Sequence, residues 1–272
     1  MQLRDNMGRG DKIVSIEIVK EKAFYEEVWF YAIVRVVFIV LLAIIVRIYI
    51  TKKAHVLEKK QKETMALVKG ITEAFAKVID MKDRYTNGHS FRVAKYTGML
   101  AKELGYNEET VQRYYQIALL HDIGKIGIPQ EVLNNPGKLS DEEFEIIKSH
   151  TSLGYDVLKE ISIMPELAVG TQAHHERPDG RGYPNHLKKD EIPRVAQIVA
   201  VADCFDAMYS NRPYRNRMNF DKVVSIIREV SGTQLTPDVV EAFLRLADKG
   251  VLRAADDVGG GTTENIDNIE KE

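Results

Sequence analysis

Five of the seven histidines in this 272-residue chain fall in one ordered series with two aspartates. The series runs His89, His121-Asp122, His150, His174-His175 and Asp203. Imidazole and carboxylate groups are the ligands that hold iron, manganese or zinc where thiolates are absent. The members are spread over about 115 residues, as ligands on separate helices that converge inside a bundle would be. The series predicts a buried site for more than one metal ion.

Each member of the series is weak evidence when it is taken alone. A single buried histidine is more often a hydrogen-bonded core residue than a metal ligand. Burying five histidines and two aspartates in one domain without a cation would be very costly, because each polar group loses its hydration. We therefore interpret the set as metal ligands.

Composition excludes several other classes of protein. The 38 basic and 40 acidic residues nearly cancel, so the charge does not favour a nucleic-acid polymer as partner. The single cysteine, Cys204, excludes an internal disulfide framework and a cysteine-rich zinc site. It lies in an apolar run, and we expect an ordinary core thiol.

Residues 28–50 form an apolar stretch that is long enough to cross a bilayer as a helix. Trp29, Tyr31 and Tyr49 lie near its two ends, as in an aromatic belt. Arg47 can extend toward the headgroups, whereas Arg35 lies deeper and needs the interface or a partner helix. We predict a single membrane span rather than a buried core helix or a cleaved signal peptide.

Lysine and arginine are more frequent after this span than before it. By the positive-inside rule, this bias predicts an inner (cytoplasmic) membrane protein with its large C-terminal part in the cytoplasm. The expected segments are a short N-terminal segment 1–27, the span 28–50, a linker helix 51–82, a main domain 83–254 and a disordered acidic tail 255–272.

The linker 51–82 carries apolar residues at steps of three and four, which favours a helix that can pair with a second copy. We therefore expect a homodimer through this helix. His55 in the linker is expected to be solvated.

The main domain is patterned as helices, and no convincing alternating strand is present, so we predict an all-α helical bundle. Ser140 and Glu143 form a capping box that should open a helix running to about Lys159. On that helix His150 shares a face with apolar side chains, which predicts that it points inward. These side chains are Ile146, Ile147, Leu153 and Val157.

Three further helices are expected in this domain. One starts near Pro165 and runs to His174-His175, and another follows Pro193. The latter has an apolar face that Asp203 and Asp206 interrupt, and a carboxylate there requires a partner such as a metal. A last helix starts at 236–238 and ends at Gly250.

Four strings in this domain resemble the HD-GYP phosphodiesterases, a subgroup of the HD metal-dependent phosphohydrolases. They are YTNGHSFRV (85–93), HDIGKIGIP (121–129), HHERPDGRGYP (174–184) and DCFDAMYSNRPYR (203–215). The resemblance covers about residues 62–250, and the full set of motifs in order is highly specific. It implies the helical HD-domain fold and hydrolysis of a cyclic dinucleotide.

The resemblance also implies a ligand set. A first metal would be held by His89, His121, Asp122 and Asp203, and Asp122 would bridge to a second metal. The histidines matching that second position are His150, His174 and His175. How the last two divide between the metals stays open, and His175 could instead support a ligand or replace one. Some members add a glutamate where this chain has Tyr85, which favours a binuclear site. The resemblance implies iron as the preferred metal and manganese as the alternative.

The resemblance implies Asp122 and Lys125 as catalytic residues. Lys125 would contact the scissile phosphate, and Arg212 and Arg215 would hold the dinucleotide. Tyr183 in the GYP loop would offer an aromatic face to a base, with a purely structural role as the alternative. Two further expectations are that Asp206 accepts a hydrogen bond from a ligand and that His186 lies on the surface.

The expected function is hydrolysis of cyclic di-GMP to linear pGpG, and to GMP if the reaction continues. Two adjacent cations would make hydroxide available at neutral pH and neutralise the phosphodiester. One alternative is another cyclic dinucleotide or nucleotide as substrate. Another is a non-catalytic receptor or scaffold that binds cyclic di-GMP or a GGDEF-domain cyclase.

Overall fold

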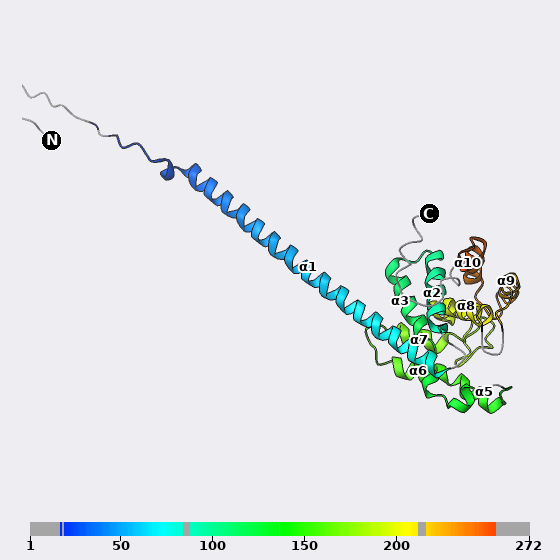
Figure 1. The fold of residues 1–272 in the computed structure, drawn as a ribbon. Coiled ribbons are helices and arrows are strands. Elements are labelled where there is room, and N and C mark those ends of the chain that lie inside the picture. The colour runs from blue at the N-terminus through cyan, green and yellow to red at the C-terminus, as the bar shows by residue number, and fades with distance from the viewer. Residues whose placement is uncertain (1–16, 18, 84–87, 136, 212–215, 254–272) are drawn as a thin grey trace, which may run out of the picture. The chain divides into compact units, whose positions relative to one another are not determined.

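A computed structural model of the chain describes residues 17, 19–83, 88–135, 137–211 and 216–253. The described residues form helices and loops, and their β pairing is limited to one isolated bridge between Ser231 and Leu235 (Figure 1). The all-α prediction is confirmed. The α-helices are α1 (Val28–Lys82), α2 (His89–Glu103), α3 (Glu108–Leu119), α4 (Gln130–Leu133), α5 (Asp141–Lys148), α6 (His150–Leu158), α7 (Glu166–Ala173), α8 (Arg194–Tyr209), α9 (Phe220–Glu229) and α10 (Pro237–Asp248). Short 3₁₀ helices are η1 (Phe24–Glu26), η2 (Ile123–Gly127) and η3 (Lys189–Glu191).

The chain divides into two compact units, residues 1–64 and 65–272. In the first unit, α1 begins at Val28 and exposes its apolar side chains along the predicted span. By length and composition this helix can cross a membrane, and none of its most apolar stretch is buried within the chain. It is a candidate membrane span.

In the second unit, the last turns of α1 present two different faces. Thr72, Ala76 and Ile79 are buried against the domain. The neighbouring face carries exposed apolar residues at three- and four-residue steps. These are Val68, Ile71, Phe75 and Val78, which are between 39% and 52% exposed.

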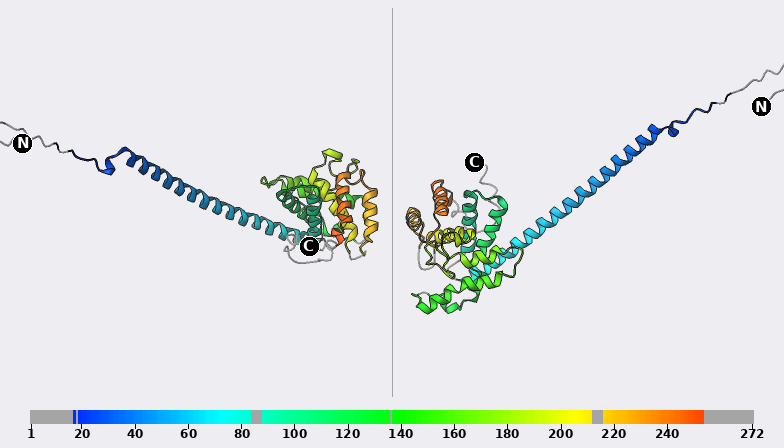
Figure 2. Two further views of the ribbon diagram at one scale, coloured as in Figure 1. Left: turned by 90° about the horizontal axis from the view of Figure 1, so that it is seen from above. Right: turned by 180° about the vertical axis from the view of Figure 1, so that it is seen from behind.

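The core of the domain surrounds α8, which packs against α2, α7, α9 and α10. Figure 2 shows α9 and α10 grouped beside α8. Phe205 on α8 is fully buried, and its ring packs against the rings of Tyr96, Tyr209 and Phe243 at centroid distances of 4.9–5.1 Å. This aromatic cluster fixes the position of α8, and Asp203 and Asp206 lie on the same helix. The core therefore determines where these two carboxylates point.

The helix predicted from Ser140 to about Lys159 is in fact two helices, because α5 ends at Lys148 and α6 begins at His150. The predicted capping box at Ser140 and Glu143 is present. His150 points inward as predicted, but the apolar face assigned to it was wrong, because its neighbours on that face are partly exposed. Ile146, Leu153 and Val157 are 39%, 37% and 58% exposed, whereas His150 is 1% exposed.

Candidate metal centre

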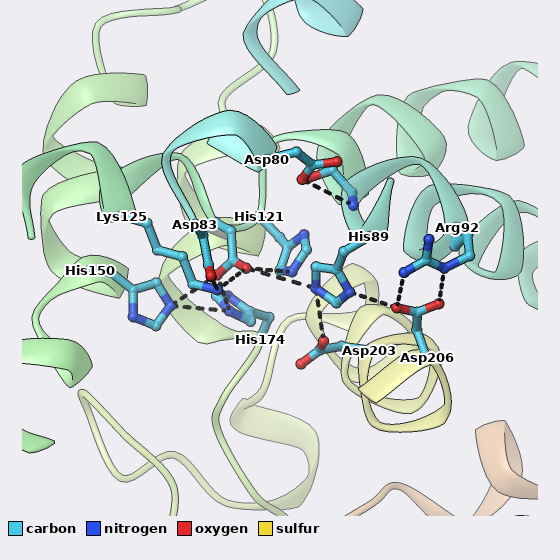
Figure 3. Close-up of polar contacts among 12 residues, drawn as sticks. Asp80, Asp83, His89, Arg92, His121, Lys125, His150, His174, Asp203 and Asp206 are labelled. Carbon is cyan, nitrogen blue, oxygen red and sulfur yellow. Dashed lines mark hydrogen bonds and ion pairs between the residues drawn. The ribbon is translucent and has the colours of Figure 1, made fainter. Parts of the chain in front are cut away.

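The predicted ligands come from five separate parts of the bundle and meet in one place (Figure 3). His89 and His150 are the first residues of α2 and α6, and Asp203 lies on α8. His121 and Asp122 follow directly after α3, and His174 follows α7. Four of the five parts are helix ends, and Asp203 is contributed from within α8.

Asp122 lies at the centre of the site and faces ligands on both sides. Its Oδ1 is 3.3 Å from Nε2 of His150 and 3.9 Å from Nε2 of His174. Its Oδ2 is 3.3 Å from Nε2 of His121 and 3.8 Å from Nε2 of His89. Asp122 therefore has one oxygen toward His150 and His174 and the other toward His89 and His121, as a ligand that bridges two ions would have.

Three groups of side chains have ligand atoms within 4.8 Å of one another. These groups are His89, His121 and Asp203; His121, Asp122 and His174; and His150, His174 and His175. His175 groups with His150 and His174, whereas His174 also groups with His121 and Asp122. The groups overlap at His121 and His174. We call the side of Asp122 that faces His89, His121 and Asp203 the first position, and the side that faces His150, His174 and His175 the second position.

Three of the histidines are oriented by a backbone carbonyl three residues earlier. Nδ1 of His121 lies 2.7 Å from the Ala118 oxygen, and Nδ1 of His150 lies 2.6 Å from the Ile147 oxygen. Nδ1 of His174 makes the same contact with the Thr171 oxygen at 2.6 Å. A carbonyl oxygen only accepts, so Nδ1 carries the proton and Nε2 keeps a lone pair aimed into the site.

The surroundings of Nε2 of His121 indicate that these residues fit a cation. It is a buried polar atom that has no hydrogen-bond partner among the described residues. An unsatisfied buried nitrogen is costly, and a cation between Nε2 and the nearby carboxylates would satisfy it. The nitrogen and oxygen donors suit a first-row divalent metal.

Burial sets the protonation of the three histidines in the second position. It lowers the pKa of His175 to about 4, and it also lowers the pKa of His150 and of His174. These rings are therefore neutral at neutral pH, the state in which imidazole binds a metal.

The first position is dominated by carboxylates. Although burial favours the neutral ring, hydrogen bonds to Asp203 and Asp206 raise the pKa of His89 to about 10. Burial is the largest single effect on Asp203 and opposes its ionisation. The hydrogen bond and charge of His89, together with the nearby histidines, outweigh it and hold the pKa of that carboxyl below its usual range. The pKa of Asp122 is also lowered, because Lys125 and His121 outweigh the effect of burial. The site concentrates negative charge that a cation can neutralise.

Lys125 lies at the edge of this site on η2. Its Nζ is 2.7 Å from Oδ2 of Asp122 and 3.1 Å from Oδ2 of Asp83. Burial alone would lower the pKa of this ammonium group, but the two carboxylates raise it, so Lys125 stays charged. A fixed positive charge beside the central carboxylate is suited to contact a phosphate.

The loop of residues 179–184 is folded tightly against the end of α7. Gly182 is required there, because a Cβ would overlap the backbone of His175, Glu176 and Arg177. The backbone N–H of Tyr183 donates to the His175 oxygen at 3.2 Å. These contacts fix the loop directly beside a predicted ligand.

Tyr183 packs its ring against His175, with centroids 4.8 Å apart and planes tilted by 32°. On the same ring, Nζ of Lys148 lies 5.8 Å from the centroid. The half-buried ring therefore lines the metal centre, and one of its contacts is structural. The site geometry is compatible with both roles considered for this residue.

Several predicted residues lie elsewhere or outside the described part. Tyr85, Arg212, Arg215 and the tail 255–272 are outside the described residues. His55 and His186 are exposed, as predicted. Cys204 is half-buried, and burial raises the pKa of its thiol to about 12, which makes it an unreactive core thiol.

Sequence reasoning missed four polar residues that support the site, namely Asp80, Asp83, Arg92 and Glu176. Asp80 accepts from Ser90 Oγ at 2.7 Å and so ties α1 to the start of α2. Buried Glu176 accepts backbone N–H groups of Asn185 and Leu187 at 2.6 and 2.9 Å, which holds the loop after the GYP motif. Its place directly after His174-His175 was an available signal, because a charged residue in a buried segment needs partners.

Comparison with known proteins places these motifs in context. The sequence matches the HD domain family over residues 73–239. It is 43% identical over 202 residues to a cyclic di-GMP phosphodiesterase of Thermotoga maritima, covering 72% of this chain and 55% of the relative. It is 39% identical over 178 residues to the 3'3'-cGAMP-specific phosphodiesterase 3 of Vibrio cholerae, covering 65% and 39%. The response regulator RpfG of Xanthomonas campestris, a cyclic di-GMP phosphodiesterase, is 37% identical over 69% of this chain and 48% of its own.

Solved structures share the fold. A cyclic GMP-AMP phosphodiesterase of V. cholerae superposes with a TM-score of 0.53 at 18% identity, covering 67% of this chain and 50% of the other. Bd1817 of Bdellovibrio bacteriovorus gives a TM-score of 0.53 at 16% identity, covering 66% and 63%. The chain spans about half the length of the curated relatives that it matches. Since the family match covers more than half of this chain and the motifs occur in order, the protein belongs to the HD domain family, within its HD-GYP group.

Proposed function

We propose that this protein is a metal-dependent phosphodiesterase that hydrolyses cyclic di-GMP to pGpG, and to GMP if the reaction continues. The observation that carries this proposal is the central carboxylate of Asp122, which faces two groups of buried histidines. Such a pair of neighbouring positions suits phosphodiester hydrolysis. The names of the most similar relatives support the same substrate class.

Both metals would be iron, with manganese as the alternative, because nitrogen and oxygen donors suit either ion. One would be held by His89, His121, Asp122 and Asp203, and the other by Asp122, His150, His174 and His175. When bound, these cations supply positive charge that neutralises the phosphodiester and makes an attacking water more acidic. No sulfur ligand is required in this arrangement.

The residues of the chain have separate roles in the reaction. Asp122 holds the two halves of the site together and keeps Lys125 in place through their 2.7 Å ion pair. Lys125 would donate to a phosphate oxygen and stabilise the charge that develops on it. Tyr183 would place its ring against a base, and Arg212 and Arg215 would bind phosphate or guanine. The roles of the two arginines rest on sequence, because they lie outside the described residues.

A second candidate substrate is 3'3'-cGAMP, because a relative 39% identical to this chain carries that specificity in its name. A third reading is a receptor that binds cyclic di-GMP, or a GGDEF-domain cyclase, without hydrolysis. The presence of every ligand position favours an enzyme over this receptor. Cyclic di-GMP and 3'3'-cGAMP differ only in one base, guanine or adenine, and the phosphodiester chemistry is the same for both. Contacts with that base would therefore decide which of the two is the substrate.

The deciding experiment uses the full chain, purified without oxygen and analysed for metal. Cyclic di-GMP and 3'3'-cGAMP are then supplied side by side, and the products are separated by chromatography. We expect linear product from cyclic di-GMP with about two iron or manganese ions per chain. His121→Ala and Asp122→Ala should lose activity and metal together, and turnover retained in either variant contradicts the proposal. A metal-loaded chain that binds cyclic di-GMP without cleaving it would support the receptor reading.

We further propose that α1 anchors the protein in the inner membrane as a single span, with the catalytic domain in the cytoplasm. The exposed apolar stretch of α1 and the excess of lysine and arginine after it support this topology. Reporter fusions after Gly70 and before Val28 test the proposal. A cytoplasmic reporter should be active only when it is fused after Gly70, and activity at both positions contradicts the topology.

The linker part of α1 would pair with a second copy to form a homodimer. Its exposed stripe follows alternating steps of four and three residues, the repeat of a two-stranded coiled coil. The stripe has five apolar members, Leu57, Val68, Ile71, Phe75 and Val78, and two polar ones, Gln61 and Thr64. In a parallel pair, Lys53 would face Glu58 of a second copy, which adds an opposite-charge contact.

Disulfide cross-linking in membranes tests this dimer. In a Cys204→Ser background, Val68→Cys and Ile71→Cys lie on the stripe, and Ala66→Cys lies on the opposite side of a heptad. We expect cross-linked dimers from the first two variants and little from the third. Equal cross-linking at all three positions, or none at any, contradicts the proposed pairing.

A further inference from the structure

His89 differs from the other histidines of the site in what orients it. His121, His150 and His174 are each held by a carbonyl oxygen three residues earlier. Nδ1 of His89 instead lies 2.7 Å from Oδ2 of Asp206, a residue 117 positions away on another helix. Its orientation therefore depends on packing between α2 and α8 rather than on local backbone.

Asp206 is itself held by an arginine on α2. Nε of Arg92 donates to Oδ1 at 2.6 Å, and Nη2 donates to Oδ2 at 3.1 Å (Figure 3). This two-point contact fixes the plane of the carboxylate. Asp206 is 1% exposed, so water does not weaken these bonds.

The contacts among His89, Arg92, Asp203 and Asp206 join α2 to α8, and we call these four residues the frame. His89 and Arg92 are three positions apart on α2, and Asp203 and Asp206 are three positions apart on α8, so each pair shares a helix face. With Nδ1 bound to Asp206, the other nitrogen of His89 points to Oδ1 of Asp203 at 3.3 Å. Arg92 and Asp206 thus aim the ligand atom of His89 without contacting the metal position themselves.

An interhelical ion pair that only stabilises the bundle is the alternative explanation. Such a pair would affect both metal positions equally, through the fold. Arg92 and Asp206 reach the site through His89, whereas His150 and His174 keep their own carbonyl contacts. The two explanations therefore differ in which metal is lost.

We propose that Arg92 and Asp206 are positioning residues that act on the His89–Asp203 metal position and not on the one formed by His150, His174 and His175. This inference rests on the binuclear centre of the proposed function. Partners of metal-binding histidines change metal affinity by about 10- to 100-fold when they are removed. Loss of the frame should therefore weaken one metal position by that factor and leave the other unchanged.

The test is a Mn²⁺ binding isotherm on the full chain, with bound metal counted per chain. Asp206→Asn keeps the shape of the side chain but lowers its strength as an acceptor, and Arg92→Gln removes the two-point contact. In Asp206→Asn we expect one site of wild-type affinity and one weakened by about 10- to 100-fold. Arg92→Gln should weaken the same site by a smaller factor, because Asp206 still accepts from His89.

A matched control exists in the same helix. Arg194 on α8 donates to both oxygens of Asp238 on α10, at 3.1 and 2.5 Å, in an interhelical pair whose carboxylate is exposed rather than buried. Asp238→Asn should leave both Mn²⁺ sites at wild-type affinity.

The outcomes separate this inference from the proposed function. Two unchanged sites in Asp206→Asn, or equal weakening of both sites, would overturn the inference while wild-type binding of two metals still supports the enzyme. A wild-type chain that binds no metal would instead overturn the proposed function. If Asp206→Asn loses its helical circular dichroism signal, Arg92→Gln carries the test, since that side chain is 30% exposed and its replacement is better tolerated.

Discussion

Gly124 lies against the backbone of His150, so closely that a Cβ at position 124 would overlap the His150 carbonyl oxygen. One turn further along α6, a Cβ at Gly154 would contact the Thr171 side chain, 2.5 Å from its Cγ2. Gly124 thus allows η2 to contact the backbone of α6, and Gly154 allows α6 to pack on the Thr171 side chain of α7. This approach brings His121-Asp122 together with His150 and His174.

Gly124→Ala should therefore move α6 away from η2 and separate His150 from Asp122. We expect a loss of about 1–3 kcal/mol in the free energy of unfolding, the usual cost of overpacking a tight contact. We also expect less bound metal, because the 3.3 Å spacing between His150 and Asp122 is disturbed. Thermal unfolding and metal content of the purified chain measure both effects.

Gly70→Ala is the control for this variant, because a Cβ at position 70 meets nothing within 4 Å. It lies in the helical part of α1, where alanine should stabilise by about 0.5–1 kcal/mol. Wild-type stability and metal content in Gly124→Ala would contradict the close packing described above.

Lys125→Met should reduce kcat while the chain keeps its metal. The variant removes the positive charge that we expect on the scissile phosphate, and one such donor contributes about 10²- to 10³-fold. Steady-state kinetics with metal analysis on the same samples measure the effect. Lys138→Met changes an exposed lysine in the loop before α5 and should leave kcat unchanged. A Lys125→Met enzyme of wild-type kcat would exclude the proposed phosphate contact.

Glu176→Ala should loosen the segment after the GYP loop, because two backbone N–H groups lose their acceptor. Unsatisfied buried donors cost about 1–3 kcal/mol, so unfolding should occur at lower urea concentration. KM should rise more than kcat falls, since the loop is expected to contact substrate rather than metal. Glu191→Ala, which removes a surface acceptor for the Lys188 N–H, should change neither. A change confined to kcat would argue against this role.

Removal of metal should destabilise the domain. Burial of several histidines and aspartates is costly without a cation, and a ligand at about 1,000 times its Kd adds about 4 kcal/mol to folding. Calorimetry with and without a chelator should show a lower Tm in the chelator and recovery on adding Mn²⁺. The His121→Ala variant should respond much less. An unchanged wild-type Tm would mean that the cluster is stable without a cation.

The sequence by itself determined the all-α fold, the apolar stretch of α1 and the ordered set of candidate metal ligands. These features depend on local patterns, such as the helix period, the capping box at Ser140 and Glu143, and motifs whose members are close in the chain. Such patterns act over a few residues and can be read without knowing which helices touch.

The tertiary structure alone decided which side chains support the site. The Asp83–Lys125 ion pair joins residues 42 positions apart, and the Arg92–Asp206 pair joins residues 114 positions apart. The buried face of α6 was misjudged for the same reason, because glycine contacts with η2 and α7 bury His150 and leave Leu153 exposed. Apolar periodicity marks the face that packs large side chains, whereas close approach of backbones is set by small residues on the neighbouring element.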